Sequence, residues 1–209
     1  MIHIKSAGAC EKPVPLQHAG SQHTTVHTVT CATVDACIQR YNIAKEKLLE
    51  VNRWHQFSGS LSANFTLTDS DGHVLDHKAQ EGDHIRVDLP GPGSRTGKGY
   101  DWVKIEKIED RSTPSGNCAY IAIRVRPSGN PYHHTDGKPA HFYDEEATSS
   151  FVIERVGTSL RACVYGRNEM PNSHPDNILD KVRNWLIALP AAAGLAKPQW
   201  KSLVKGLLK

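Results

Sequence analysis

The stretch EGDHIRVDLPGPGSRTGKGYDWVKIEKIE, residues 81–109, decides the fold class. Hydrophobic and polar residues alternate over residues 84–89, which is typical of a strand with one buried and one wetter face. Six Pro and Gly residues over 90–99 then exclude a regular helix or strand. Because the alternation resumes at Trp102, we predict two antiparallel strands joined by a long loop.

The same reasoning extends in both directions from this hairpin. Thr33 is a good N-cap residue, and hydrophobic residues recur at helical spacing over 34–54, so we predict an amphipathic helix that packs through Ile38, Tyr41 and Leu48. From Phe57 the period becomes two, which predicts a strand, a turn at residues 69–72 and a return strand over 73–78. Further strands are predicted over residues 24–31, 118–126, 150–156 and 160–165, and further helices over 178–189 and from about Pro198.

These elements predict an α+β fold: a curved antiparallel β-sheet or half-open barrel of about seven strands, flanked by one N-terminal and two C-terminal helices. We expect residues 1–33 to form an N-terminal arm or an edge strand. Residues 34–209 are predicted to form a single α+β domain.

Composition excludes several classes of protein. The chain has 209 residues, of which 38% are hydrophobic, so it can bury a core, and its formal net charge is only +3. No apolar run approaches the roughly 20 residues that cross a bilayer, and the first residues lack the apolar stretch of a secretory signal. The 5 cysteines include no CxxC pair, so we expect free thiols and a cytoplasmic location.

The segment PGSRTGKG, residues 92–99, invites comparison with the phosphate-binding P-loop. Pro92 stands where that motif has its first glycine, Gly99 stands where it has a hydroxyl residue, and a strand follows in place of a helix. We therefore predict no bound nucleotide and no cofactor. Acidic residues interleave with the basic ones, so nucleic-acid binding is disfavoured; the basic set is Arg95, Lys98, Lys104, Lys107, Arg124 and Arg126.

A long loop over residues 127–149 holds a candidate metal site. His133, His134, Asp136 and His141 supply three imidazoles and a carboxylate, which are ligand types that zinc uses. Their spacing is neither HxH on a strand nor HxxxH on a helix, so a solvated polar loop is the alternative. A metal bound here would favour an enzyme, although no catalytic signature is present elsewhere in the sequence.

Two predicted strands share an unusual second face of Cys, Ala, Tyr and Arg. A plainly solvated face would carry Thr, Lys and Glu, so this face is expected to be partly covered, with arginines that can bind a carboxylate or phosphate. We predict a ligand site with Tyr120 and Tyr165 as walls and Arg124 and Arg167 as anion-binding groups. In the alternative interpretation, the helix over 178–189 covers the patch and the arginines pair with Glu106 and Glu154.

The sequence thus favours a non-catalytic binding module for a small apolar-anionic ligand or for a protein partner. The alternative is an enzyme with the His/Asp site on the loop. Metal analysis of the purified protein would separate these two functions.

Overall fold

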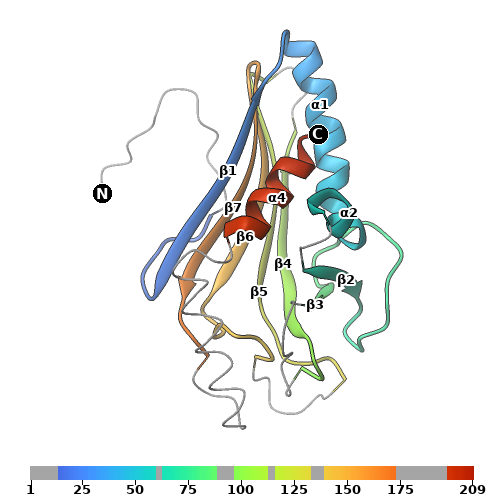
Figure 1. Ribbon diagram of the computed structural model, residues 1–209, viewed down its shortest axis with the longest axis vertical. Coiled ribbons are helices and arrows are strands. Elements are labelled where there is room, and N and C mark those ends of the chain that lie inside the picture. Colours follow the sequence, from blue (N-terminus) through green and yellow to red (C-terminus); the bar gives the residue numbers. More distant parts are fainter. Residues whose placement is uncertain (1–13, 60–62, 89–96, 113–115, 133–138, 173–196) are drawn as a thin grey trace.

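The computed structural model describes residues 14–59, 63–88, 97–112, 116–132, 139–172 and 197–209 (Figure 1). The strands form one antiparallel sheet of seven strands in the order β1-β7-β6-β5-β4-β3-β2. They are β1 (Ser21–Thr30), β2 (Asn64–Thr68), β3 (His84–Asp88), β4 (Asp101–Arg111), β5 (Cys118–Pro127), β6 (Thr148–Val156) and β7 (Ser159–Glu169). The helices are α1 (Val34–Leu49), the 3-10 helix η1 (Val51–Arg53), α2 (Trp54–Ser58) and α4 (Lys197–Leu207).

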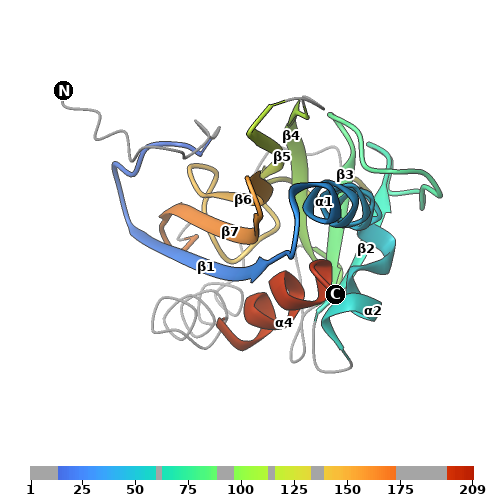
Figure 2. The ribbon, with the colours of Figure 1, turned by 90° about the horizontal axis from the view of Figure 1, so that it is seen from above.

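The predicted fold class, an α+β fold with a curved antiparallel sheet, is confirmed. Bulges lie between Ser21 and His23 on β1 and between Ile105 and Lys107 on β4, where an extra residue bends a strand. Figure 2 shows the bent sheet from above, with α1 and α4 on the same side of it. β1 and β2 occupy the two edges, so the barrel stays half open. The helix predicted over residues 178–189 lies outside the described residues.

The hairpin that decided the fold class forms as predicted. β3 and β4 pair antiparallel, with Ile85 opposite Val103 and Val87 opposite Asp101. Ile85, Val87 and Val103 are buried in the main core. The alternation of hydrophobic residues therefore marks the face that meets the helices.

The helix predicted over 34–54 is interrupted at Glu50, whose backbone leaves the helical region (φ −85°, ψ 63°). Hydrogen bonds to distant segments explain this interruption. The carbonyl oxygen of Leu49 accepts from the backbone N–H of Ala79 at 2.9 Å, and the Asn52 side chain bonds the backbones of both Leu67 and Leu75. These bonds tie the helix end to β2 and to the segment after it.

The strand predicted from Phe57 is wrong at residues 57–58, because residues 54–58 form α2. The Trp54 indole Nε1 donates to the carbonyl oxygen of Leu48 at 3.0 Å, and its buried ring holds this turn against the sheet. The predicted return strand over 73–78 is also wrong. Only an isolated bridge joins Thr68 to Val74, and β2 takes β3 as its partner instead.

An aromatic cluster fixes the helices on one face of the sheet. The ring of Trp54 lies 5.2 Å from Phe65 and 4.7 Å from Phe151, between centroids, and Trp200 of α4 lies 5.5 Å from Phe151. Gly206 allows α4 to approach α2, because a Cβ there would lie 1.9 Å from the carbonyl oxygen of Phe57. The cluster thus joins α2, α4, β2 and β6 in one core.

The expectation of free thiols is confirmed for Cys31, Cys37 and Cys163 and is wrong for Cys118, which is disulfide-bonded. The inference of a reducing compartment loses that support. Within the described part of the chain, no helix is both long and apolar enough to cross a membrane.

We expect the substitution Leu48→Ala to lower the free energy of unfolding by about 2–5 kcal/mol, because it leaves a cavity at a fully buried position of α1. The matched control is Ile43→Ala on the same helix, where the side chain is 56% exposed and the change should stay within about 0.5 kcal/mol. Urea unfolding monitored by circular dichroism measures both. Equal losses would show that the buried face of α1 is assigned wrongly.

Candidate functional site

The predicted ligand-site residues lie together on the face of β5, β6 and β7 that is turned away from the helices. We call this surface the Arg–Tyr face; it comprises Tyr120, Ala122, Arg124, Arg126, Thr148, Ser150, Val152, Cys163, Tyr165 and Arg167. Strand pairing sets Arg124, Ser150 and Tyr165 side by side in one row across the three strands. Strand pairing therefore places the predicted ligand-site residues on one face of the sheet. The role of these residues in binding stays a prediction.

The centre of the Arg–Tyr face is an apolar floor. Ala122, Val152 and Cys163 form the next row across the strands, and all three are buried. Tyr120 completes this second hydrophobic cluster, and Tyr165 packs against it. The helices α1, α2 and α4 contribute to the core on the opposite face, so this floor is separate from the core that they close.

Two buried hydroxyl groups stand at one end of this floor. Ser150 is 0% exposed and Thr148 is 2% exposed. Among the described residues, neither Ser150 Oγ nor Thr148 Oγ1 has a hydrogen-bond partner. Each such group costs free energy in the folded protein, because burial removes its water without a replacement.

Arg124 lies opposite Ser150 across the β5–β6 pair, and Arg126 is the next residue along the same face of β5. Arg124 Nε donates to Glu106 Oε2 at 3.1 Å, and Arg126 Nε donates to Glu106 Oε1 at 2.5 Å, so two arginines share one carboxylate. The bulge on β4 explains this sharing, since Glu106 is the extra residue between Ile105 and Lys107. Glu106 fixes the orientation of both arginines and compensates only one of their charges.

Arg167 lies opposite Thr148 across the β6–β7 pair, and its guanidinium turns toward β1. Its Nη1 donates to the carbonyl oxygens of Gly166 at 2.7 Å and His23 at 2.9 Å, and its guanidinium lies 5.3 Å from the ring centroid of Tyr165. These partners are neutral. The contacts thus set three guanidinium groups against one carboxylate, that of Glu106, among the described residues of this end of the face.

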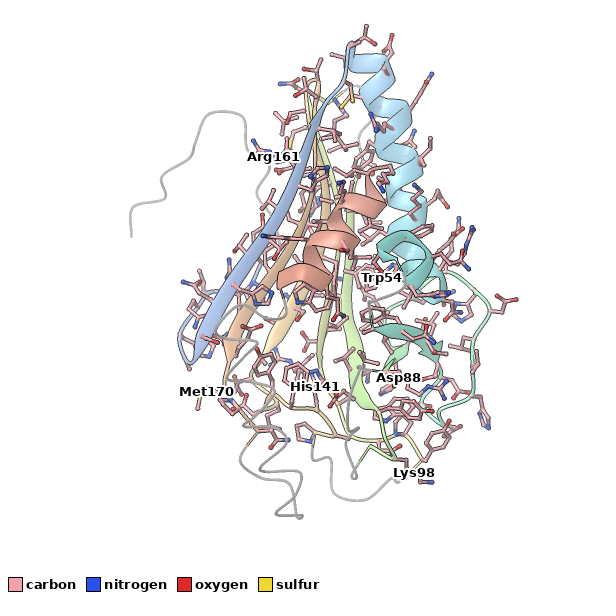
Figure 3. All side chains as sticks on the ribbon, viewed as in Figure 1. Trp54, Asp88, Lys98, His141, Arg161 and Met170 are labelled. Carbon is pink, nitrogen blue, oxygen red and sulfur yellow. The ribbon has the colours of Figure 1, made fainter. Side chains whose placement is uncertain are left out.

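The other end of the face is closed by internal pairs. Tyr120 donates its hydroxyl to Glu109 Oε1 at 2.5 Å, and burial raises the pKa of Tyr120 to about 12, so this phenol stays protonated. Arg161, labelled in Figure 3 on the upper half of the sheet, lies 4.0 Å from Glu154. The pairing of arginines with Glu106 and Glu154, which the alternative interpretation required, is therefore observed for Arg124, Arg126 and Arg161. The covering helix that it also required lies outside the described residues.

Of the predicted metal ligands, the structure describes only His141; His133, His134 and Asp136 lie outside the described residues. His141 stacks on Phe142 with centroids 4.2 Å apart, and its Nδ1 accepts from the backbone N–H of Tyr143 at 3.0 Å. Figure 3 places it at the lower end of the sheet. The metal site therefore stays a prediction.

The predicted turn at residues 69–72, which we did not consider as a metal site, brings other possible metal ligands together. Ligand atoms of Asp69, Asp71 and His73 lie within 4.8 Å of one another, directly after β2. The spacing D-x-D-x-H is visible in the sequence, so this group was open to prediction. These side chains already bond one another and the turn, with Asp69 Oδ2 3.1 Å from His73 Nδ1. The turn thus has a structural explanation.

Sequence reasoning missed a buried polar network on the concave face. The Glu169 side chain is only 3% exposed, and its Oε1 lies 2.9 Å from His23 Nδ1. Its carboxylate also accepts a hydrogen bond from the Tyr143 hydroxyl. Gly166 leaves room for it, since a Cβ there would lie 2.2 Å from Glu169 Oε1. Burial raises the pKa of Tyr143, with the Glu169 carboxylate adding to the shift. Because 146 residues separate His23 from Glu169, no local pattern signals the pair.

No protein-family model matches the chain, and no curated protein matches it. Among solved structures, norcoclaurine synthase from Thalictrum flavum is 6% identical with a TM-score of 0.40, covering 96% of each chain. Ara h 8.0201 is 10% identical with a TM-score of 0.39, covering 90% of this chain and 99% of that one. A START superfamily protein from Mycobacterium smegmatis is 13% identical with a TM-score of 0.32, covering 88% and 99%. At these values the likenesses carry no argument about this chain, whose fold is described from its own strand pairing.

The buried network should matter for stability. We expect Glu169→Ala to lower the free energy of unfolding by about 2–4 kcal/mol, because it strips His23 and Tyr143 of a buried acceptor. The control is Glu146→Ala, whose carboxylate is 59% exposed and 3.7 Å from His18, and which should change stability by less than about 1 kcal/mol. Chemical unfolding at neutral pH compares them. If Glu169→Ala is as mild as the control, the network contributes nothing to folding.

Proposed function

We propose that this protein is a non-catalytic binding module that holds a small ligand on the Arg–Tyr face. The ligand has an apolar body, which lies over Ala122, Val152 and Cys163, and an anionic end, which lies beside Ser150 and Thr148. The observation that carries the proposal is the pair of buried hydroxyl groups that have no partner among the described residues, at strand positions opposite Arg124 and Arg167.

The chemistry of this end favours an anion. A carboxylate or sulfonate presents several acceptor oxygens, and the hydroxyl groups of Ser150 and Thr148 can each donate one hydrogen bond to it. Arg124 and Arg167 lie on strands two positions apart, roughly 10 Å, so both side chains can reach a group above Ser150. Bonds between ionised groups and their donors are shorter and stronger than neutral ones.

The dimensions favour a small ligand over a folded partner. Three strands span only about 10 Å between the outer two backbones, and the apolar floor is one row deep between the Tyr120 and Arg124 rows. A stable protein interface buries about 800 Å² on each partner, far more than this floor offers. A protein partner would have to use surface beyond the Arg–Tyr face.

The first test compares two fluorescent probes, 8-anilinonaphthalene-1-sulfonate and its uncharged relative N-phenyl-1-naphthylamine. We expect Arg124→Lys to weaken binding of the sulfonate about tenfold and to leave the uncharged probe unchanged, because lysine keeps the charge and loses the planar fork. The control is Arg53→Lys, an exposed arginine paired with Glu50 on η1, which should bind both probes as the wild type does. Equal affinity of the sulfonate for all three proteins would contradict the assignment of Arg124.

The second test uses stability and affinity together. We expect Ser150→Ala to raise the free energy of unfolding by about 1 kcal/mol, since it removes a buried hydroxyl without a partner, and to weaken binding of the sulfonate probe severalfold. Ser128 provides a matched control, because its Oγ is also buried and unpartnered within the described residues and lies outside the Arg–Tyr face. Ser128→Ala should be stabilised without a loss of binding. Unchanged binding in Ser150→Ala would remove the hydroxyl from the site.

A further inference from the structure

The strand β1 is 10 residues long and forms one edge of the sheet, with β7 as its neighbour (Figure 2). The N–H of Cys31, directly after β1, donates to the carbonyl oxygen of Thr158 at 2.9 Å. Residues of an antiparallel pair alternate between bonding the partner strand and pointing away from it. Counting back from Cys31, the residues whose N–H and C=O groups point away from β7 are therefore Thr24, Val26, Thr28 and Thr30.

The two edges of the sheet differ in how their outward backbone groups are satisfied. At the other edge, β2 has only 5 residues. The N–H of Leu67 donates to Asn52 Oδ1 at 2.7 Å, and its carbonyl oxygen accepts from the N–H of Leu75 at 2.9 Å. Within the described part of the chain, no hydrogen bond reaches the outward backbone groups of β1. An edge of this kind is a template for the addition of another strand.

The sequence of β1, SQHTTVHTVT, lacks the residues that usually prevent an edge strand from pairing. It contains no Lys, Arg, Asp, Glu or Pro. Its bulge lies at the very start, between Ser21 and His23, so residues 23–30 form a regular strand. At the centre of this stretch, Val26 is 48% exposed on the side of the sheet that carries the Arg–Tyr face. A strand added at this edge would cover part of the Val26 side chain.

The strand β1 is complementary to a second copy of itself. When two copies run antiparallel with Val26 opposite Val26, Thr24 of each copy lies opposite Thr28 of the other. The outward N–H and C=O groups of these three residues then all have partners across the seam. Only β-branched side chains meet on the exposed face, where such pairs pack well. Because β1 carries no Lys, Arg, Asp or Glu, like charges do not oppose each other at the seam.

We propose that β1 pairs with β1 of a second copy of this chain, antiparallel and centred on Val26, so that the two sheets become one continuous sheet. The interface is isologous, with its two-fold axis perpendicular to the sheet. Both Arg–Tyr faces then lie on the same side of the dimer. Permanent dimers bury about 1,000 Å² or more on each partner, which exceeds what one strand edge offers. The dimer therefore forms at high protein concentration and dissociates on dilution.

Sedimentation velocity over a wide range of protein concentration tests the proposal. We expect the wild type to change from monomer to dimer as the concentration rises. Val26→Lys and Val26→Glu should each stay monomeric, because opposed Cβ atoms lie only about 5 Å apart and would carry like charges. An equal mixture of the two variants should form a heterodimer, because the opposed charges are then of opposite sign. The control Ile43→Lys changes another exposed hydrophobic residue, 56% exposed on α1, and should dimerise as the wild type does.

Three results would overturn the proposal. The first is a wild type that stays monomeric at the highest concentration. The second is a dimer that persists in both Val26 variants, since its interface must lie elsewhere. The third is a mixture of the two variants that does not associate, since Val26 then does not face Val26. Circular dichroism checks that each variant is folded.

Hydrogen exchange measured by NMR gives a second readout on the unaltered protein. The amides of Thr24, Val26 and Thr28 should exchange fast in dilute solution and become protected in the dimer. The amides of Thr25 and His27 bond β7 and should be protected at both concentrations. Protection of the first three amides in the dilute monomer would show that another part of the same chain covers this edge, and the proposal would be wrong.

Discussion

The structure depends on the packing of Trp54 between the sheet and the helices. Its indole contacts Phe65 on β2 and Phe151 on β6, two strands at opposite parts of the sheet order, and Trp200 of α4 joins the same cluster. A ring that meets both strands requires the sheet to bend around it. The cluster therefore couples the curvature of the sheet to the positions of α2 and α4, and aromatic side chains supply the largest buried areas for that purpose.

This coupling gives the two faces of the sheet different roles. The concave face is filled by side chains from α1, α2 and α4, which leave the strand residues there mainly aliphatic. The Arg–Tyr face contributes little to that core, so its residues are less constrained by packing and can carry unsatisfied hydroxyl groups and guanidinium groups. Packing on the concave face supplies most of the stability, and the residues of the Arg–Tyr face can therefore differ in chemical type without disturbing that core.

The sequence predicted the elements whose signal is local. Alternation located the β3–β4 hairpin, and Thr33 marked the start of α1. It failed where a distant partner overrides the local pattern: Asn52 and Ala79 end the first helix early, and Trp54 draws the next residues into α2. Period two placed Arg124 and Tyr165 on the second face of their own strands, and the pairing with β6 sets them in one row. The sharing of Glu106 could not, because it depends on a bulge.

The same contrast between local patterns and distant contacts explains why some polar groups could be predicted from the sequence and others could not. The pair of His23 and Glu169 and the hydrogen bond from Arg155 to the carbonyl oxygen of Gly116 join segments far apart in the chain, and each buried partner can be recognised only in the fold. Arg155 occupies a position on β6 between hydrophobic residues that face the core, where a charged side chain breaks the expected pattern. A buried guanidinium is costly unless its donors are bonded. Carbonyl oxygens of Gly116 and Gly157 meet that need without neutralising the charge, so Arg155 remains a cation inside the core.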